Sequence, residues 1–339
     1  MCGPTLGIQH PSNSATDAGD LTENDELEAV VAHQRHPSAH LLVARVCHFL
    51  RVAFGSELLF GSDIFLKLSV YMMLRPVITR QGTRFYQSLK RSFSSDKPPI
   101  KHVIITGASG GIGRAIAARF ASEGAKCTLV GRTESKLQAS LRELSALRDH
   151  RIVVGDVGKE AFWKDLAKKM KEDKEHCDVL VNAAGITHYS LLVRTPAAKV
   201  DEVIDTNLRG TILGCQYMVK DMMRKKTGCI INISSLLGVK GGRGSSVYAA
   251  SKAGVLGFTR ALAAEAGPTG VRVNAVVPGY IETEMTSGMD SALFESTKNA
   301  IPLQRFGTAE EVADAAFFLA ANQYANNCTL NLDGGLSAV

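Results

Sequence analysis

A β-branched run, a glycine-rich turn and a helical pattern follow one another shortly after residue 100. The run VII at 103–105 leads into TGASGGIG at 106–113, and apolar residues then recur at helical spacing as far as Phe120. Glycines let backbone N–H groups approach a phosphate, and the start of a helix adds partial positive charge. This order predicts a phosphate-binding strand–turn–helix unit, which is a building block of parallel sheets.

The same alternation of strand and helix continues along the chain. Short apolar runs predict further strands at 126–131, 151–154, 178–181 and 230–235, and helical patterns lie at about 134–147 and about 246–266. Strands that alternate with helices at this spacing predict an α/β fold with a doubly wound parallel sheet. Ligands of such a fold bind at the carboxyl ends of the strands, where Gly107, Asp156 and Asn182 are expected to lie.

The chain is predicted to divide into three regions. Of its 339 residues, 45% are hydrophobic and 21% are charged, which is enough apolar material for a core. Residues 96–339 are predicted to form a single folded domain, and an upstream extension at 1–72 is expected to be largely unstructured. The apolar stretch at 41–74 is interrupted by charged residues, so no stable membrane span is expected there.

Residues 73–95 have the composition of a mitochondrial transit peptide. They hold five basic residues, several Ser and Thr and no acidic residue, and RSFSS at 91–95 resembles a matrix-peptidase site. The expected location is therefore the mitochondrial matrix, or the cytoplasm if this segment is only a basic linker. Because such a signal acts at an N-terminus, we expect translation to start at Met72 or Met73, with 1–71 as a misjoined or alternative upstream segment.

Charge and cysteine usage narrow the function classes. The formal net charge is +6 without a dominant polybasic tract, so no nucleic-acid partner is expected. The seven cysteines form no CxxC pair and several lie in apolar runs, which indicates reduced core residues. His33, His36 and His40 lie close in sequence, but Pro37 interrupts any helix there, so no metal site is expected.

The end of the second predicted strand indicates which dinucleotide would bind. A protein that binds NAD usually has an acidic residue there, which bonds the adenosine ribose. This chain has Gly131 and Arg132 instead. Because a guanidinium can pair with a 2′-phosphate, NADP(H) is the expected cofactor. The alternative is that Arg132 is a surface residue at the start of the next helix.

Tyr248 and Lys252 lie four residues apart in the sequence YAASKAG. Residues at i and i+4 share a helical face, so the lysine ammonium can lie near the phenol and lower its pKa. A tyrosine tuned in this way can exchange a proton near neutral pH, although a lone Tyr-x-x-x-Lys pair also arises by chance. Ser235 ends the fifth predicted strand, whereas the serines at 245–246 adjoin the helix and Ser234 should face the opposite side.

Residues 100–339 resemble the short-chain dehydrogenase/reductase family. The motifs that carry the resemblance are TGASGGIG at 106–113, NAAG at 182–185, Asn207 in DTNLRG, the set of Ser235, Tyr248 and Lys252, and Pro278-Gly279, all in family order and spacing. The resemblance implies a Rossmann-like, single catalytic domain and an NADP-dependent oxidoreductase.

The resemblance also implies a role for each of four catalytic residues. Tyr248 is expected to be the general acid that protonates a carbonyl oxygen as hydride arrives, and Ser235 to hydrogen-bond that oxygen. Lys252 is expected to bond the nicotinamide ribose and to lower the pKa of Tyr248. Asn207 is expected to hold a water that links Lys252 to solvent.

The expected cofactor contacts come from the ends of several strands. They are Gly107, Ser109, Gly111, Ile112, Gly113, Arg132, Asp156, Val157, Asn182, Ala183, Gly185, Tyr248, Lys252, Pro278, Gly279, Ile281 and Thr283. Asp156 and Val157 are expected to flank the adenine. Thr283 is expected near the carboxamide and the pyrophosphate.

Within the family, the chain resembles in particular the bacterial and mitochondrial 3-oxoacyl-[acyl-carrier-protein] reductases and the related mitochondrial carbonyl reductase. The similar stretches lie at 180–195, 246–265, 272–286, 301–320 and 331–335. This resemblance implies NADPH-dependent reduction of a 3-oxoacyl thioester to its 3-hydroxyacyl product in fatty acid synthesis. The substrate would be bound to acyl-carrier protein or be a small carbonyl compound, and the enzyme would be a homo-oligomer, either a tetramer or a dimer.

Some positions depart from that branch of the family. His188-Tyr189 replaces a common Arg-Asp, Thr269 replaces a basic residue, and 325–327 (ANN) replaces Ile-Thr-Gly. The basic run at 224–226 is a candidate dock for an acidic carrier protein, or else a solvated turn. Residues 283–300 are expected to form a mobile lid over an acyl chain, or else an ordinary surface helix.

Two other functions stay open. A reductase of the same family could act on free ketones, quinones or steroids. A non-catalytic subunit could bind a dinucleotide and stabilise a partner enzyme.

Overall fold

The computed structural model describes residues 100–144 and 148–338. The predicted upstream extension at 1–72 and the predicted targeting segment at 73–95 lie outside the described residues. The last residues of the predicted helix at 134–147 also lie outside them.

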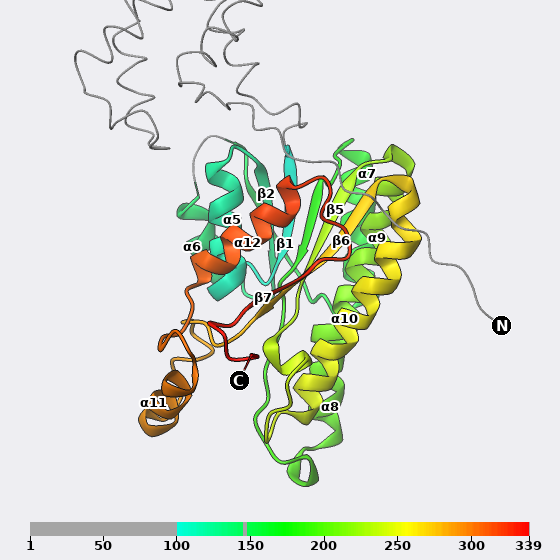
Figure 1. The fold of residues 1–339 in the computed structure, drawn as a ribbon. Coiled ribbons are helices and arrows are strands. Elements are labelled where there is room, and N and C mark those ends of the chain that lie inside the picture. Colours follow the sequence, from blue (N-terminus) through cyan, green and yellow to red (C-terminus); the bar gives the residue numbers. More distant parts are fainter. Residues whose placement is uncertain (1–99, 145–147, 339) are drawn as a thin grey trace, which may run out of the picture. The chain divides into compact units, whose positions relative to one another are not determined.

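The centre of the domain is a seven-stranded parallel sheet with the strand order β3-β2-β1-β4-β5-β6-β7 (Figure 1). The strands are β1 (His102–Thr106), β2 (Lys126–Gly131), β3 (Arg151–Val154), β4 (Val179–Asn182), β5 (Gly228–Ile233), β6 (Val271–Pro278) and β7 (Thr329–Leu332). The predicted α/β class and doubly wound parallel sheet are therefore confirmed. The order reverses between β1 and β4, and a parallel sheet opens a crevice at such a point.

Helices cover both faces of the sheet. They are α5 (Gly111–Ser122), α6 (Glu134–Arg142), α7 (Glu160–Glu172), α8 (Ala197–Ile204), α9 (Gly210–Lys225), α10 (Ser246–Ala266), α11 (Ser291–Ala300) and α12 (Ala309–Ala321). Figure 1 shows α5, α6 and α12 on one side of the sheet and α7, α9 and α10 on the other.

Alternation along the strands explains the two cores. Val103 and Ile105 pack in the same cluster as Phe120 of α5, whereas Ile104 packs with Trp163 of α7 on the other face. Because side chains of a strand alternate between faces and both faces are covered, the central residues of β1, at 103–105, form an uninterrupted apolar run. All five residues of β1 are accordingly buried.

The bounds of three predicted elements were wrong. β4 runs over Val179–Asn182 and not over 178–181. α6 ends at Arg142 and not at about Leu147. The fifth strand begins at Gly228 and ends at Ile233, so Ser234 and Ser235 lie beyond it.

The sequence ANN at 325–327, which replaces the usual Ile-Thr-Gly, does not prevent the last strand, β7, from forming. Asn326 Oδ1 accepts a hydrogen bond from the Val273 backbone N–H at 2.9 Å, and Asn327 adopts a left-handed backbone with φ of 58°. Asparagine tolerates this conformation better than most residues. β7 therefore still pairs with β6.

The cysteines of the described part of the chain are free. Cys127, Cys177, Cys215 and Cys229 are buried, and Cys328 is partly buried. Within the same part of the chain, no helix is long and apolar enough to cross a membrane, and no group of three His, Cys, Asp or Glu side chains could hold a metal ion.

Gly113→Ala is expected to lower the free energy of unfolding by about 1–3 kcal/mol. A Cβ at this position would lie 2.3 Å from the Gly107 carbonyl oxygen, which is backbone and cannot rotate away. Urea unfolding of the full chain measures the effect. Gly241→Ala is the matched control, because its Cβ would meet nothing within 4 Å. Equal stabilities of the two variants would contradict this packing argument.

Candidate active site

The turn between β1 and α5 is built so that backbone can approach a ligand. Gly107 has a φ of 68°, and a Cβ there would lie 2.7 Å from the Ala183 carbonyl oxygen. Gly110 precedes α5 without a side chain that caps the helix, so no side chain competes for the first N–H groups. The turn therefore offers free backbone donors and a helix N-terminus at the carboxyl end of β1.

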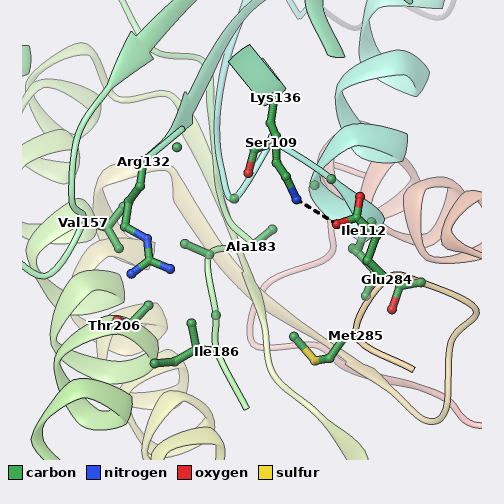
Figure 2. Close-up of a pocket in the computed structure, with 18 of the residues that line it drawn as sticks. Ser109, Ile112, Arg132, Lys136, Val157, Ala183, Ile186, Thr206, Glu284 and Met285 are labelled. Carbon is green, nitrogen blue, oxygen red and sulfur yellow. Dashed lines mark hydrogen bonds and ion pairs between the residues drawn. The ribbon is translucent and has the colours of Figure 1, made fainter. Parts of the chain in front are cut away.

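This turn forms one wall of a cavity at the carboxyl ends of β1 to β4 (Figure 2). Eleven of the predicted cofactor residues line it, namely Gly107, Ser109, Gly111, Ile112, Gly113, Arg132, Asp156, Val157, Ala183, Gly185 and Thr283. The structure thus brings together residues from five separated segments of the chain.

The end of β2 offers a cation and no carboxylate to this cavity. Gly131 and Arg132 both line the cavity, and Arg132 extends into it in Figure 2. A guanidinium at this place fits a phosphate on the adenosine ribose, whereas an acidic residue would repel it. Together with the open glycine turn, these residues fit NADP(H).

Several residues that line the cavity were not among the predicted cofactor contacts, although two of them lie in the predicted lid at 283–300. Among them are Lys136, Thr206, Ile186, Glu284 and Met285. Glu284 and Met285 directly follow the predicted Thr283, and Lys136 lies four residues after Arg132, so adjacency to predicted residues was the available signal. Lys136 Nζ and Glu284 Oε2 form an ion pair at 3.0 Å.

Some predicted cofactor residues do not line the cavity. Asn182 is buried, and its side-chain amide donates to Asn232 Oδ1 at 2.9 Å and contacts Cys215 Sγ at 3.3 Å. Its side chain therefore holds β4 to β5 inside the sheet. Pro278, Gly279 and Ile281 form the connection from β6 to the cavity-lining Thr283. A Cβ at Gly279 would lie 2.8 Å from Asp333, and Ile281 is buried in the core.

Ser235, Tyr248 and Lys252 meet where β5 ends and α10 begins. A hydrogen bond joins the side-chain hydroxyls of Ser235 and Tyr248. Lys252 Nζ lies 5.8 Å from the centre of the Tyr248 ring and donates to the Ile233 carbonyl oxygen at 2.9 Å. The predicted trio is thus brought together by the first two turns of one helix and the end of one strand.

Burial shifts the pKa of both titratable groups in this trio. Desolvation lowers the pKa of Lys252 from 10.5 to about 8. Desolvation also raises the pKa of Tyr248, and the hydrogen bond with Ser235 partly opposes that rise. The predicted net lowering of the Tyr248 pKa is therefore not found, because burial outweighs the other influences and the Lys252 amine is bonded to Ile233.

Asn207 lies in a π-helical turn, Asp205–Arg209, between α8 and α9. Its side chain accepts a hydrogen bond from the Ile186 N–H at 2.8 Å and donates to the Ser251 hydroxyl at 3.1 Å. A Cβ at Gly185 would lie 3.3 Å from Lys252 Nζ and 3.4 Å from Asn207 Oδ1. Gly185 is therefore the single residue between the cavity and the side chains of Lys252 and Asn207. The π-helical turn that holds Asn207 is of a type frequent at functional sites.

Ser234 and Ser235 have different partners, as the alternation predicted. The Ser234 hydroxyl donates to the Lys252 carbonyl oxygen at 2.8 Å and is buried. On the same face of β5, Asn232 donates to Thr259 of α10 at 2.9 Å. These two bonds fix α10 against β5 and leave Ser235 for Tyr248.

The candidate carrier dock at 224–226 is wrongly placed for that task. These residues end α9 just before β5 begins, so they lie at the amino edge of the sheet, whereas the cavity lies at the carboxyl edge. Arg224 and Lys225 pair with Asp221 instead.

The predicted lid contains turns followed by α11. Its first part, Thr283 to Met285, lines the cavity. Met289 and Phe294 pack on a cluster that includes Phe306, while no residue of α11 is fully buried. The lid role stays a prediction.

Comparisons with known proteins are consistent with this geometry. The family model described as Enoyl-(Acyl carrier protein) reductase matches residues 107–337. The 3-oxoacyl-[acyl-carrier-protein] reductase of Bos taurus is 40% identical over 232 residues, which cover 68% of this chain and 96% of that protein. Carbonyl reductase family member 4 of Xenopus laevis is 39% identical over 232 residues, with the same coverage of 68% and 96%.

A bacterial relative and a solved structure are also similar to this chain. The 3-oxoacyl-[acyl-carrier-protein] reductase of Chlamydia muridarum is 39% identical over 241 residues, which cover 70% of this chain and 97% of that protein. The crystal structure of a candidate gluconate dehydrogenase from Agrobacterium tumefaciens superimposes with a TM-score of 0.68 at 30% identity and covers 70% of this chain and 96% of its own.

The parent chain is expected to gain free energy of unfolding as the pH rises above about 8, and Lys252→Met is expected to abolish this gain. The pKa of Lys252 is about 8 in the folded chain and near 10.5 when solvated, so the unfolded chain binds more protons between these values. The free energy of unfolding of the parent should therefore rise from about pH 8 to 10.5, by roughly 3 kcal/mol at most for this group. Urea unfolding at a series of pH values measures it. The exposed Lys168→Met is the control and should keep the rise; an identical pH profile of Lys252→Met and parent would contradict the shifted pKa.

Proposed function

Because the chain belongs to the short-chain dehydrogenase/reductase family, we propose that it reduces a 3-oxoacyl thioester to the 3-hydroxyacyl product with NADPH. Members of this family are oxidoreductases that use NAD(H) or NADP(H). The observation that carries the proposal is the position of Gly185, which lines the cavity and where an added Cβ would touch Lys252 Nζ and Asn207 Oδ1. This position joins the cofactor cavity to the Ser235–Tyr248 pair.

The reaction adds a hydride to the carbonyl carbon and a proton to the carbonyl oxygen. When bound, reduced nicotinamide supplies the hydride. The hydroxyls of Ser235 and Tyr248 donate hydrogen bonds to the oxygen on which negative charge develops. Tyr248 then gives its proton to that oxygen, so the product is an alcohol.

The residues around Tyr248 support its role as the acid. Its raised pKa keeps the phenol protonated at neutral pH. Lys252, with a pKa of about 8, is charged at neutral pH and favours the phenolate that forms when the proton leaves. Asn207 holds the loop at Ile186 beside the site, and its predicted role in a proton relay to Lys252 stays part of the proposal.

The preference for NADPH, the acyl-carrier substrate and the oligomer belong to the same proposal. Arg132 at the cavity supports a 2′-phosphate. The names of the Bos taurus and Chlamydia muridarum relatives support a 3-oxoacyl substrate bound to carrier protein. We expect a tetramer or dimer, and a location in the mitochondrial matrix because of the composition of residues 73–95.

A second candidate is a reductase of free carbonyl compounds. His188-Tyr189 stands where the carrier-dependent branch commonly has Arg-Asp, and a relative from Xenopus laevis is named as a carbonyl reductase. Tyr189 is 72% exposed and its ring faces Gly244, so it lies beside the loop that leads into the catalytic helix. An aromatic surface at this place suits a flat apolar ketone or quinone.

A substrate panel separates these functions. Oxidation of NADPH is followed optically with carrier-bound acetoacetyl thioester, a small acetoacetyl thioester, a quinone and a steroid ketone. We expect the highest kcat/KM with a 3-oxoacyl thioester, and high salt should lower it only for the carrier-bound form. Preference for the quinone or steroid would favour the second candidate. Binding of NADPH without turnover of any carbonyl would favour a non-catalytic subunit.

Tyr248→Phe is expected to lower turnover by about 10²–10⁴-fold, because it removes the proton donor and keeps the ring. NADPH affinity should stay within about twofold of the parent, since the phenol is not a phosphate contact. Single-turnover kinetics and fluorescence titration measure the two effects. Tyr324→Phe, at a position that is 98% exposed, is the control and should react at the parent rate. Equal turnover of Tyr248→Phe and parent would contradict the acid role.

A further inference from the structure

Two oppositely charged side chains meet across the cofactor cavity. Lys136 belongs to the first turn of α6, and Glu284 belongs to the segment that follows β6, 148 positions further along the chain. Both line the cavity, and their ion pair at 3.0 Å is drawn in Figure 2. The two side chains are 56% and 68% exposed, so solvent weakens the pair.

The pair lies between the glycine turn and the end of β2. A Cβ at Gly110 would lie 3.4 Å from Glu284 Oε1, which places the carboxylate over the turn. A Cβ at Gly131 would lie 3.4 Å from Ser109, which places the turn against the end of β2. The adenosine ribose of a dinucleotide binds at the end of β2 in a fold of this kind. Lys136 therefore stands close to the place where a 2′-phosphate would project.

Lys136 attracts a phosphate at this part of the cavity, and Glu284 is an anion that already occupies Lys136. A phosphate carries roughly −1.5 to −2 charges at neutral pH, against −1 for a carboxylate, so a phosphate competes effectively for Lys136. The Lys136 interaction lowers the pKa of Glu284, so this carboxylate is ionised at neutral pH.

We propose that Lys136 is a second residue, beside Arg132, that selects the 2′-phosphate of NADP(H), and that it exchanges Glu284 for this phosphate on binding. Glu284 acts as the competing anion that a dinucleotide without a 2′-phosphate cannot displace. The inference deepens the proposed NADPH-dependent function and rests on its cofactor part.

Binding of nucleotide fragments to the full chain tests the exchange. Isothermal titration at low salt compares adenosine 2′,5′-bisphosphate with adenosine 5′-monophosphate, which lacks the 2′-phosphate. Lys136→Gln should weaken the bisphosphate about tenfold, as expected for one charge-assisted contact, and the monophosphate less than twofold. Arg132→Ala is the reference for loss of a 2′-phosphate contact. An unchanged bisphosphate affinity, or an equal loss for both nucleotides, would overturn the proposal.

Removal of the competing anion tests the role of Glu284. Glu284→Gln should strengthen the bisphosphate two- to threefold, roughly the effect of one exposed charge, and the double variant Lys136→Gln/Glu284→Gln should bind no tighter than Lys136→Gln. Lys168→Gln and Glu172→Gln, from an exposed ion pair at 3.9 Å on α7, are the matched controls and should not change binding. A gain that persists in the double variant, or no gain, would overturn the exchange.

The outcomes also separate this inference from the proposed reaction. Failure to reduce carbonyls, with the nucleotide effects present, would remove the reaction and leave the exchange intact. A parent chain that does not distinguish the two nucleotides would overturn both the exchange and the NADPH preference. Normal turnover with unchanged nucleotide affinities in Lys136→Gln would overturn the exchange alone.

Discussion

The contact between the glycine turn and the start of its own helix determines the position of the cavity. Gly113 lies so close to the Gly107 carbonyl oxygen that only a residue without a Cβ fits, and a Cβ at Gly107 would lie 2.7 Å from the Ala183 carbonyl oxygen. β1, α5 and the end of β4 are thereby held together at the point where the strand order reverses. The free N–H groups of α5 consequently face the crevice, and a phosphate site follows from backbone packing alone.

The reactive groups depend on a second set of contacts, between β5 and α10. Asn232 bonds Thr259 and Ser234 bonds the Lys252 carbonyl, so strand and helix are joined at two levels. This attachment aims Ser235 at Tyr248. Neighbouring serines therefore have separate partners, Ser234 the backbone of α10 and Ser235 the Tyr248 hydroxyl, because their side chains leave the chain on opposite sides.

Much of the fold could be predicted because buried parallel strands read as apolar runs and the glycine turn has a local sequence signature. The end of β5 could not, because the Ser234 backbone N–H still donates a hydrogen bond to the Val276 carbonyl oxygen although the strand ends at Ile233. Asn182 was predicted as a cofactor contact because it ends a strand. Its position along the strand did not show that its side chain points into the sheet.

Contacts between residues far apart in the sequence limited how much of the site could be predicted. Arg132 could be predicted because it directly follows a strand that the sequence identifies. Lys136 and Glu284 come together from positions 148 residues apart, and nothing in either local sequence indicates the other. The Tyr248 pKa was likewise beyond the sequence, since its direction depends on how deeply the fold buries the phenol.

In the proposed reaction, the buried amine of Lys252 allows one site both to keep and to release a proton. An acid must hold its proton at rest, and burial of Tyr248 ensures this by raising its pKa. Release then needs positive charge nearby, which Lys252 provides below its pKa of about 8 and the N-terminus of α10 provides at any pH. Lys252 bonds only a backbone carbonyl in the contacts described, so its charge opposes folding. An apolar residue would give a more stable helix–sheet contact, so the amine lowers stability while it provides the charge that the proposed reaction needs.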